Sequence, residues 1–150
     1  MKKIAIVLAG LVISLYLLAL VIPINPDEQR PGTRLSGDWA SEAPNWSALA
    51  ERAQLQVQTH PWYGIPHSVT TTSFVVDGTL YVPCARCPTK RWPKNVAQDP
   101  QVVIKANGQL YAGLAERVTD AAILHTIFDE NHSQRDDVYL YQITPTPGSE

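Results

Sequence analysis

The chain has 150 residues, which favours a single small domain, and its 12 Lys and Arg are outnumbered by 14 Asp and Glu. The formal net charge of −2 argues against nucleic acid as a bulk partner. The charge is uneven, however, because residues 78–98 contain no acid while Arg86, Lys90, Arg91 and Lys94 all fall there. This stretch is predicted to attract anions.

An uncharged apolar stretch opens the chain. Lys2 and Lys3 precede residues 4–22, which carry no charge. This run is long enough to span a bilayer and exceeds the usual signal-peptide core of about 7–15 residues. We expect a retained signal anchor, with a cleaved signal peptide and a buried core helix as alternatives. The two lysines indicate a cytoplasmic N-terminus, so the domain is expected on the periplasmic or extracellular side of the membrane.

The remainder divides into three parts. Residues 26–44 are rich in Pro, Gly, Ser and Asp and predict a linker after the anchor at 1–25. Residues 45–144 are expected to form the domain, and residues 145–150 a disordered tail. In the domain, Asn45 is a candidate N-cap for a short helix to about residue 53, with apolar residues at helical spacing. The end of this helix is left open, because residues 55–59 alternate like a strand.

Two hairpins are predicted by their turn residues. Asp77-Gly78 and Asn107-Gly108 each lie between two strand-like runs, and such pairs favour two-residue turns that need positive φ at both positions. The predicted strands around them are residues 68–76, 79–82, 101–106 and 109–118.

Two helices and a last strand complete the domain. Residues 92–98 predict a short helix with Pro93 at its first position, where the missing N–H is tolerated. Thr119 or Asp120 is expected to cap a helix that runs to about Asn131, and residues 138–144 alternate as a strand. The fold class is therefore mainly β with a few helices. Because the domain has two hairpins and few residues to cover a flat sheet, we predict that the sheet closes into a small β-barrel.

Three segments resemble a known family when taken in order. They are Gly64-Ile65-Pro66-His67-Ser68, then Phe74-Val75-Val76-Asp77-Gly78-Thr79-Leu80-Tyr81-Val82, and, after a basic loop, residues 92–120 with Asn107-Gly108-Gln109-Leu110-Tyr111 inside them. Together they resemble the flavin-binding split β-barrel superfamily of pyridoxamine 5'-phosphate oxidase-like proteins, over about residues 54–144. The closest likeness is to the deazaflavin-dependent nitroreductase branch, whose members carry Trp, Asn three residues later and Pro five further. Here these are Trp92, Asn95 and Pro100.

The resemblance implies a cofactor and a partner. It implies a homodimer that binds FMN or a deazaflavin coenzyme at the subunit interface, with the phosphate held after the first hairpin. Lys90, Arg91 and Lys94 meet there at a predicted helix start, and Arg grips phosphate in a bidentate way. The alternative is that these are solvated surface cations. Further candidate cofactor-binding residues are Trp92, Asn95, Thr70 and Thr72, with Thr71 beside them, although strand threonines are commonly strand formers only.

Cys84 and Cys87 are the only cysteines and have C-x-x-C spacing. In a periplasmic domain we expect them to form a disulfide. A redox couple, half of a zinc site completed by His60 and His67, and free thiols are the alternatives. A disulfide would close a short loop, so its main expected effect is to fix the shape of the basic loop. No metal site is predicted.

Two functions from different classes remain. The sequence has no Ser-His-Asp set, phosphate loop or Rossmann glycines, so hydrolase and nucleotidase functions have no support. The leading hypothesis is a membrane-anchored flavin- or deazaflavin-binding split-barrel protein that acts as an oxidoreductase similar to the nitroreductases, with catalytic residues unassigned. The alternative is a non-catalytic periplasmic binding or assembly module without a cofactor.

Overall fold

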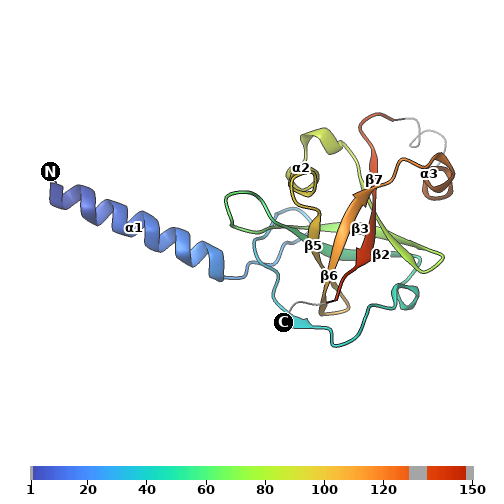
Figure 1. The fold of residues 1–150 in the computed structure, drawn as a ribbon, viewed down its shortest axis with the longest axis horizontal. Helices are drawn as coiled ribbons and strands as arrows, with labels where there is room; N and C mark the ends of the chain where they lie inside the picture. The colour runs from blue at the N-terminus through green and yellow to red at the C-terminus, as the bar shows by residue number, and fades with distance from the viewer. Residues whose placement is uncertain (1, 129–134, 148–150) are drawn as a thin grey trace.

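A closed six-stranded barrel forms the body of the protein. The computed structural model describes residues 2–128 and 135–147 (Figure 1). Antiparallel pairing joins β2 to β3, β3 to β4, β4 to β7, β7 to β6, β6 to β5 and β5 back to β2, which closes the sheet. The strands are β2 (Arg52–Thr59), β3 (His67–Val76), β4 (Thr79–Cys84), β5 (Gln101–Ala106), β6 (Gln109–Arg117) and β7 (Tyr139–Pro145). The predicted mainly-β barrel is confirmed.

Both predicted hairpin turns are present. Asp77 and Gly78 have φ of 49° and 74°, and Asn107 and Gly108 have φ of 50° and 83°. Two consecutive residues in the left-handed region are what the tight turn between twisted strands requires. The local chemistry of these turns therefore fixes the register of β3 with β4 and of β5 with β6.

The core fills the barrel with aliphatic side chains from all the strands. Val57, Leu80, Val82 and Ile104 have no exposed surface. Two tryptophans outside the strands extend this core. The ring centroids of Trp46 and Tyr111 are 5.3 Å apart, and those of Trp92 and Tyr141 are 4.9 Å apart.

The helices are shorter than predicted. The expected helix from Asn45 to about residue 53 is wrong, because only the 3-10 turn η1 (Trp46–Ala48) forms, Asn45 makes no side-chain cap, and β2 begins at Arg52. The apolar spacing there reflects Trp46 entering the core and the start of a strand. The helix α2 (Arg91–Val96) begins one residue earlier than expected, so Pro93 is its third residue, still within the first turn.

The last helix also ends early. Asp120 caps α3 (Ala121–Ile127) by accepting a 2.8 Å hydrogen bond from the Ala122 N–H, and Phe128 has an extended backbone. The expected end at Asn131 lies outside the described residues. Of the expected tail, Pro145 belongs to β7 and the Thr146 N–H donates to the Ala112 carbonyl, while residues 148–150 are not described.

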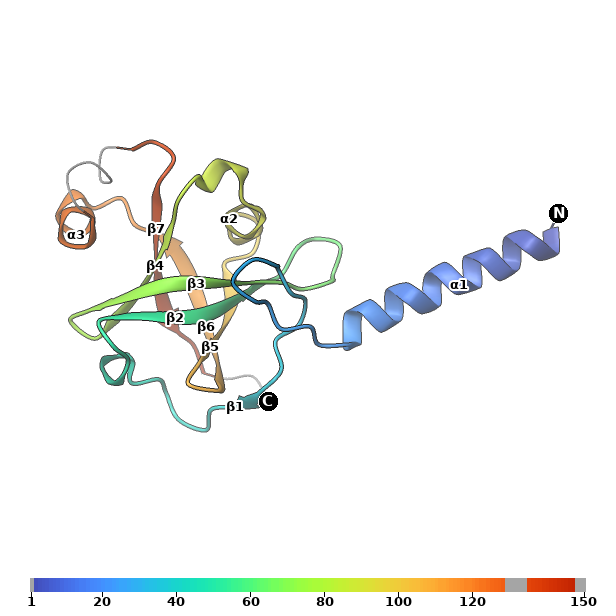
Figure 2. The ribbon, with the colours of Figure 1, turned by 180° about the vertical axis from the view of Figure 1, so that it is seen from behind.

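The N-terminal helix α1 (Lys2–Val21) projects away from the barrel (Figures 1 and 2). None of its residues is buried, so the alternative of a core helix is excluded. By its length and composition, α1 could cross a membrane, and a signal sequence would share this property.

Residues 23–36, which we call the strap, lie on the outer face of β2 and β3. Gly32 and Ser68 exchange backbone hydrogen bonds of 2.9 and 3.1 Å, and the Pro26 carbonyl accepts from Gln56 and Thr70. The strap also folds on itself, with the Thr33 N–H donating to the Ile24 carbonyl at 2.8 Å. The first part of the expected linker is therefore packed against the barrel. After it, β1 (Asp38–Trp39) pairs in parallel with the start of β6.

Candidate functional site

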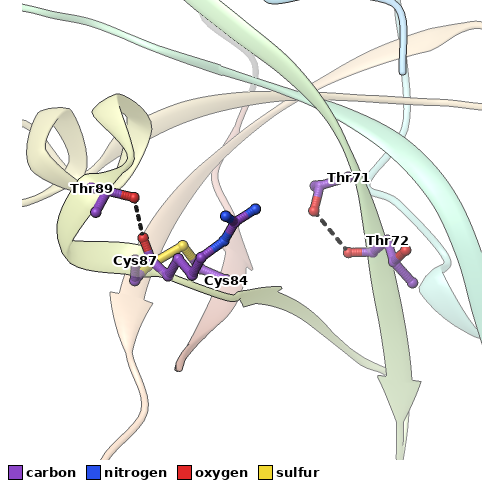
Figure 3. Close-up of a disulfide and its surroundings, with 6 residues drawn as sticks. Thr71, Thr72, Cys84, Cys87 and Thr89 are labelled. Atoms are coloured by element: carbon purple, nitrogen blue, oxygen red, sulfur yellow. Dashed lines mark hydrogen bonds between the residues drawn. A yellow bond between two sulfur atoms is a disulfide. The ribbon is translucent and has the colours of Figure 1, made fainter. Parts of the chain in front are cut away.

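A disulfide shapes the loop between β4 and α2. Cys84, the last residue of β4, is bonded to Cys87, the first residue of the 3-10 turn η2 (Cys87–Thr89) (Figure 3). Arg86 between them has a left-handed backbone with φ of 52°. The Arg86 carbonyl accepts from both the backbone N–H and the hydroxyl of Thr89, at 3.1 and 2.8 Å. These bonds fix the loop immediately before α2.

In this loop the disulfide and the cationic side chains differ in burial. Both cysteines are buried, whereas Arg86, Lys90 and Arg91 are exposed. Among the residues that the structure describes, none of these three cations forms an ion pair. Three cationic side chains are therefore held near one another and available to an anion.

The cations line a cleft of about 620 Å³. Its lining comes from the loop, from β3 and from residues 27–31 of the strap. Figure 3 shows Thr71 on the side of β3 that faces the loop. The strap adds Arg30 but also the carboxylates of Asp27 and Glu28. The lining residues are Asp27, Glu28, Gln29, Arg30, Pro31, His67, Val69, Thr70, Thr71, Pro83, Cys84, Ala85, Arg86, Thr89, Lys90, Arg91 and Trp92.

His67 at the start of β3 is the titratable group most affected by this setting. Burial lowers the pKa of its imidazole, and the positive charge of Arg91 lowers it further. The neutral ring is therefore favoured near neutral pH, so it can both donate and accept a hydrogen bond in the cleft.

A buried chain of hydrogen bonds holds α2 in place over β2 and β3. The Asn95 side-chain amide donates to the Thr59 hydroxyl at 2.9 Å, and that hydroxyl donates to the His67 carbonyl at 3.0 Å. Asn95 and Thr59 are both buried. This chain ties the helix that follows the basic loop to the strand that carries His67.

The structure brings together only part of the residue set that the sequence suggested. Lys90, Arg91, Trp92 and Thr70 line the cleft, although the Trp92 ring is mostly in the core and the Thr70 hydroxyl donates to the strap. Asn95 is buried beneath α2 and does not line the cleft.

Lys94 and Thr72 also lie outside this cleft. Lys94 lines a separate groove with Pro93, Tyr139 and Arg117. Thr72 is half-buried further along β3, where its carbonyl accepts from the Thr71 hydroxyl.

Three contributions to the cleft were missed from the sequence. Arg86 belongs to the acid-free stretch but was not assigned to the site, although its position in the C-x-x-C loop was a usable signal. His67 was considered only as a zinc ligand, and the strap residues only as a linker. Nothing in the sequence indicated that residues 27–31 fold back over β3.

The donor set of the cleft fits a phosphate group. Arg86 and Arg91 can each present two N–H donors and Lys90 a point charge, and together they exceed the two carboxylates of the strap. The helix itself adds little, because α2 has only six residues. Within the described part of the chain, no group of three or more His, Cys, Asp or Glu side chains is arranged to hold a metal ion.

Neither protein-family models nor the curated protein sequences gave a match to this chain. Solved structures do match. General stress protein 26 from Bacillus anthracis has a TM-score of 0.51 at 18% identity, covering 64% of this chain and 81% of that one. An F420 reductase has a TM-score of 0.50 at 19% identity, covering 69% and 95%.

A protein of unknown function from Agrobacterium tumefaciens has a TM-score of 0.50 at 18% identity, covering 61% of this chain and 47% of that one. These likenesses concern the fold alone. The chain has a split β-barrel fold, as the sequence resemblance implied.

Proposed function

We propose that this domain binds a flavin or deazaflavin, with FMN the first candidate, and works as an oxidoreductase that α1 anchors to a membrane. The observation that carries the proposal is the cluster of Arg86, Lys90 and Arg91 on one wall of a cleft of about 620 Å³. Small-molecule and cofactor sites commonly enclose about 300–1,000 Å³. Structural similarity to an F420 reductase supports the deazaflavin alternative.

In this proposal the protein binds and orients the cofactor. Arg91 and Lys90 hold the phosphate, Arg86 approaches it from the disulfide loop, and the neutral His67 ring offers a hydrogen bond at the edge of β3. When bound, a flavin or deazaflavin supplies the hydride chemistry. We propose no catalytic acid or base.

We also propose that the protein is a homodimer and that its barrel lies on the periplasmic or extracellular side of the membrane. The dimer is supported by the resemblance, and the location by Lys2 and Lys3 before the apolar helix. Light scattering of the detergent-solubilised chain measures the oligomeric state. Protease accessibility of the barrel in spheroplasts measures on which side of the membrane it lies.

Titration of the protein with FMN tests the cofactor site. A charge-assisted hydrogen bond is worth about 1.5–3 kcal/mol, so Arg91→Ala should weaken binding roughly 10- to 100-fold. Lys94→Ala is the matched control, because it removes a cation three residues away that does not line the cleft. It should leave the Kd unchanged. The effect of Arg91→Ala should shrink as salt rises, since ions screen the contact in the parent.

Two results would contradict the proposal in different ways. If the parent binds neither FMN nor a deazaflavin at micromolar concentration, the cofactor assignment fails. The alternative of a non-catalytic binding or assembly module then stands, and the carboxylates of Asp27 and Glu28 beside the cations favour it. If the parent binds and the two variants behave alike, the phosphate is held elsewhere.

A further inference from the structure

The loop between β2 and β3 carries an aromatic pair that the cleft does not use, the exposed Trp62 and the half-buried Tyr63. Trp62 is 86% exposed, the highest value among the large apolar side chains that the structure describes. Tyr63 stacks edge-on against it, with the ring centroids 5.7 Å apart. Pro61 and Pro66 on either side are buried, so the base of the loop is anchored while its aromatic tip points outward.

This loop contacts the N-terminal helix. The Tyr16 hydroxyl in α1 donates a 2.7 Å hydrogen bond to the Tyr63 carbonyl. Gly64, at a φ of 83°, lies so close to the helix that a Cβ there would be 3.2 Å from the Tyr16 Oη and 3.6 Å from the Leu20 Cδ2. Both ribbon views show the loop extending from the barrel toward the barrel-proximal end of α1 (Figures 1 and 2).

The contact sets the height of the loop relative to a bilayer. At 1.5 Å per residue, the 20 residues of α1 are about 30 Å long, which matches the hydrocarbon thickness of a membrane. Tyr16 lies about 8 Å before the end of the helix on the same scale. A loop bonded to Tyr16 therefore extends at least as far as the boundary between hydrocarbon and headgroups, where Trp and Tyr side chains are enriched.

A cation lies at the same end of the molecule. Arg34 is exposed and pairs through a β-bridge with Pro23, two residues after α1 ends. A guanidinium so close to the helix end is positioned to contact lipid phosphates.

We propose that the β2–β3 loop inserts Trp62 and Tyr63 into the headgroup region of the membrane that α1 spans. The barrel is then held against the bilayer at two places, which limits its rotation about the helix. This inference rests on the membrane anchoring in the proposed function and adds a second, lipid-facing surface to it.

Fluorescence quenching of the full chain in lipid vesicles tests the insertion. The vesicles are made of phosphatidylcholine with acyl chains brominated near the headgroup, and unbrominated vesicles give the reference. Trp62 is one of four tryptophans, so bromination should lower the emission of the parent by about a quarter. Trp62→Phe should abolish most of this quenching. Trp46→Phe is the matched control, because Trp46 is buried in the barrel, and quenching should persist in it.

Flotation of the same vesicles separates the two levels of failure. If the full chain floats with the vesicles but Trp62→Phe and the parent are quenched equally, the loop does not insert, while the anchor stands. If the full chain does not float, the anchoring fails and this inference fails with it. If Trp62 is unquenched and Trp62→Phe changes the oligomeric state instead, the loop binds a second copy of the chain rather than lipid.

Discussion

At the scale of single residues, the basic loop separates structural from ligand-facing side chains. The disulfide of Cys84 and Cys87 is buried and fixes the backbone, while Arg86 and Arg91 point outward from the same segment. His67 lies opposite, and its lowered pKa reports on both burial and the Arg91 charge. A neutral ring beside Arg86, Lys90 and Arg91 leaves the cleft with more cationic than anionic side chains, even with Asp27 and Glu28 in its lining.

The depressed pKa of His67 makes stability depend on pH. The unfolded chain binds a proton on this ring below about pH 6.5, whereas the folded chain binds it only at lower pH. His67 therefore costs no stability above that pH, and stability is lost as the pH falls below it. Urea unfolding at about pH 7.5 and about pH 5.5 should show a smaller loss in His67→Gln than in the parent. Equal losses in the parent and in His67→Gln would contradict the assignment.

At the scale of elements, the strap is the unexpected component of the fold. Gly32 is required where it crosses β3, because a Cβ there would lie 2.6 Å from the Pro26 nitrogen and 2.7 Å from the Ser68 Oγ, and would collide with the Ile24 carbonyl. The turn before it is held by Asp27, whose carboxylate accepts from the N–H groups of Gln29 and Arg30. The strap therefore packs tightly enough to serve as a wall of the cleft.

Substituting Gly32 should detach the strap. Overpacking typically destabilises by about 1–3 kcal/mol, so Gly32→Ala should lower the free energy of unfolding by about that amount. The amide protons of Gly32 and Ser68 should exchange faster, since each donates to the other residue. Gln29→Ala is the control, as its side chain is exposed on the same strap. Unchanged exchange at Gly32 and Ser68 in the Gly32→Ala variant would show that the strap tolerates the methyl group.

At the scale of the whole molecule, local chemistry was predictable and long-range packing was not. The turns at Asp77-Gly78 and Asn107-Gly108 encode two hairpins on their own, whereas the closing pairs of β7 with β4 and β6 join distant segments. The residues of the cleft also divide into those predictable from local sequence and those that depend on long-range packing. Lys90 and Arg91 were found because they lie in one acid-free stretch, but which way Lys94 and Asn95 face depends on how α2 packs on the barrel.

The first strap residues after α1 are held by later strap residues. Pro23 forms a β-bridge with Arg34, and the Ile24 carbonyl accepts a hydrogen bond from the Thr33 N–H. A cut near Asn25, as expected for a cleaved signal peptide, would remove both partners from the barrel. Retention of the helix, which we propose, would preserve them. The strap would then give the anchor a structural role that a signal peptide would not have.

Two truncated chains test this connection. The full chain should fractionate with membranes, and chains that start at Pro23 or at Asp27 should both be soluble, because each lacks the apolar helix. The shorter chain loses the two hydrogen bonds between Ile24 and Thr33 and the two that the Pro26 carbonyl accepts from Gln56 and Thr70. At about 0.5–1.5 kcal/mol per hydrogen bond, these four bonds predict a free energy of unfolding in urea that is lower by about 2–6 kcal/mol than that of the longer chain. Equal stability would show that the first strap residues contribute nothing to the barrel, and recovery of the full chain as a soluble protein cut near Asn25 would replace the anchor by a signal peptide.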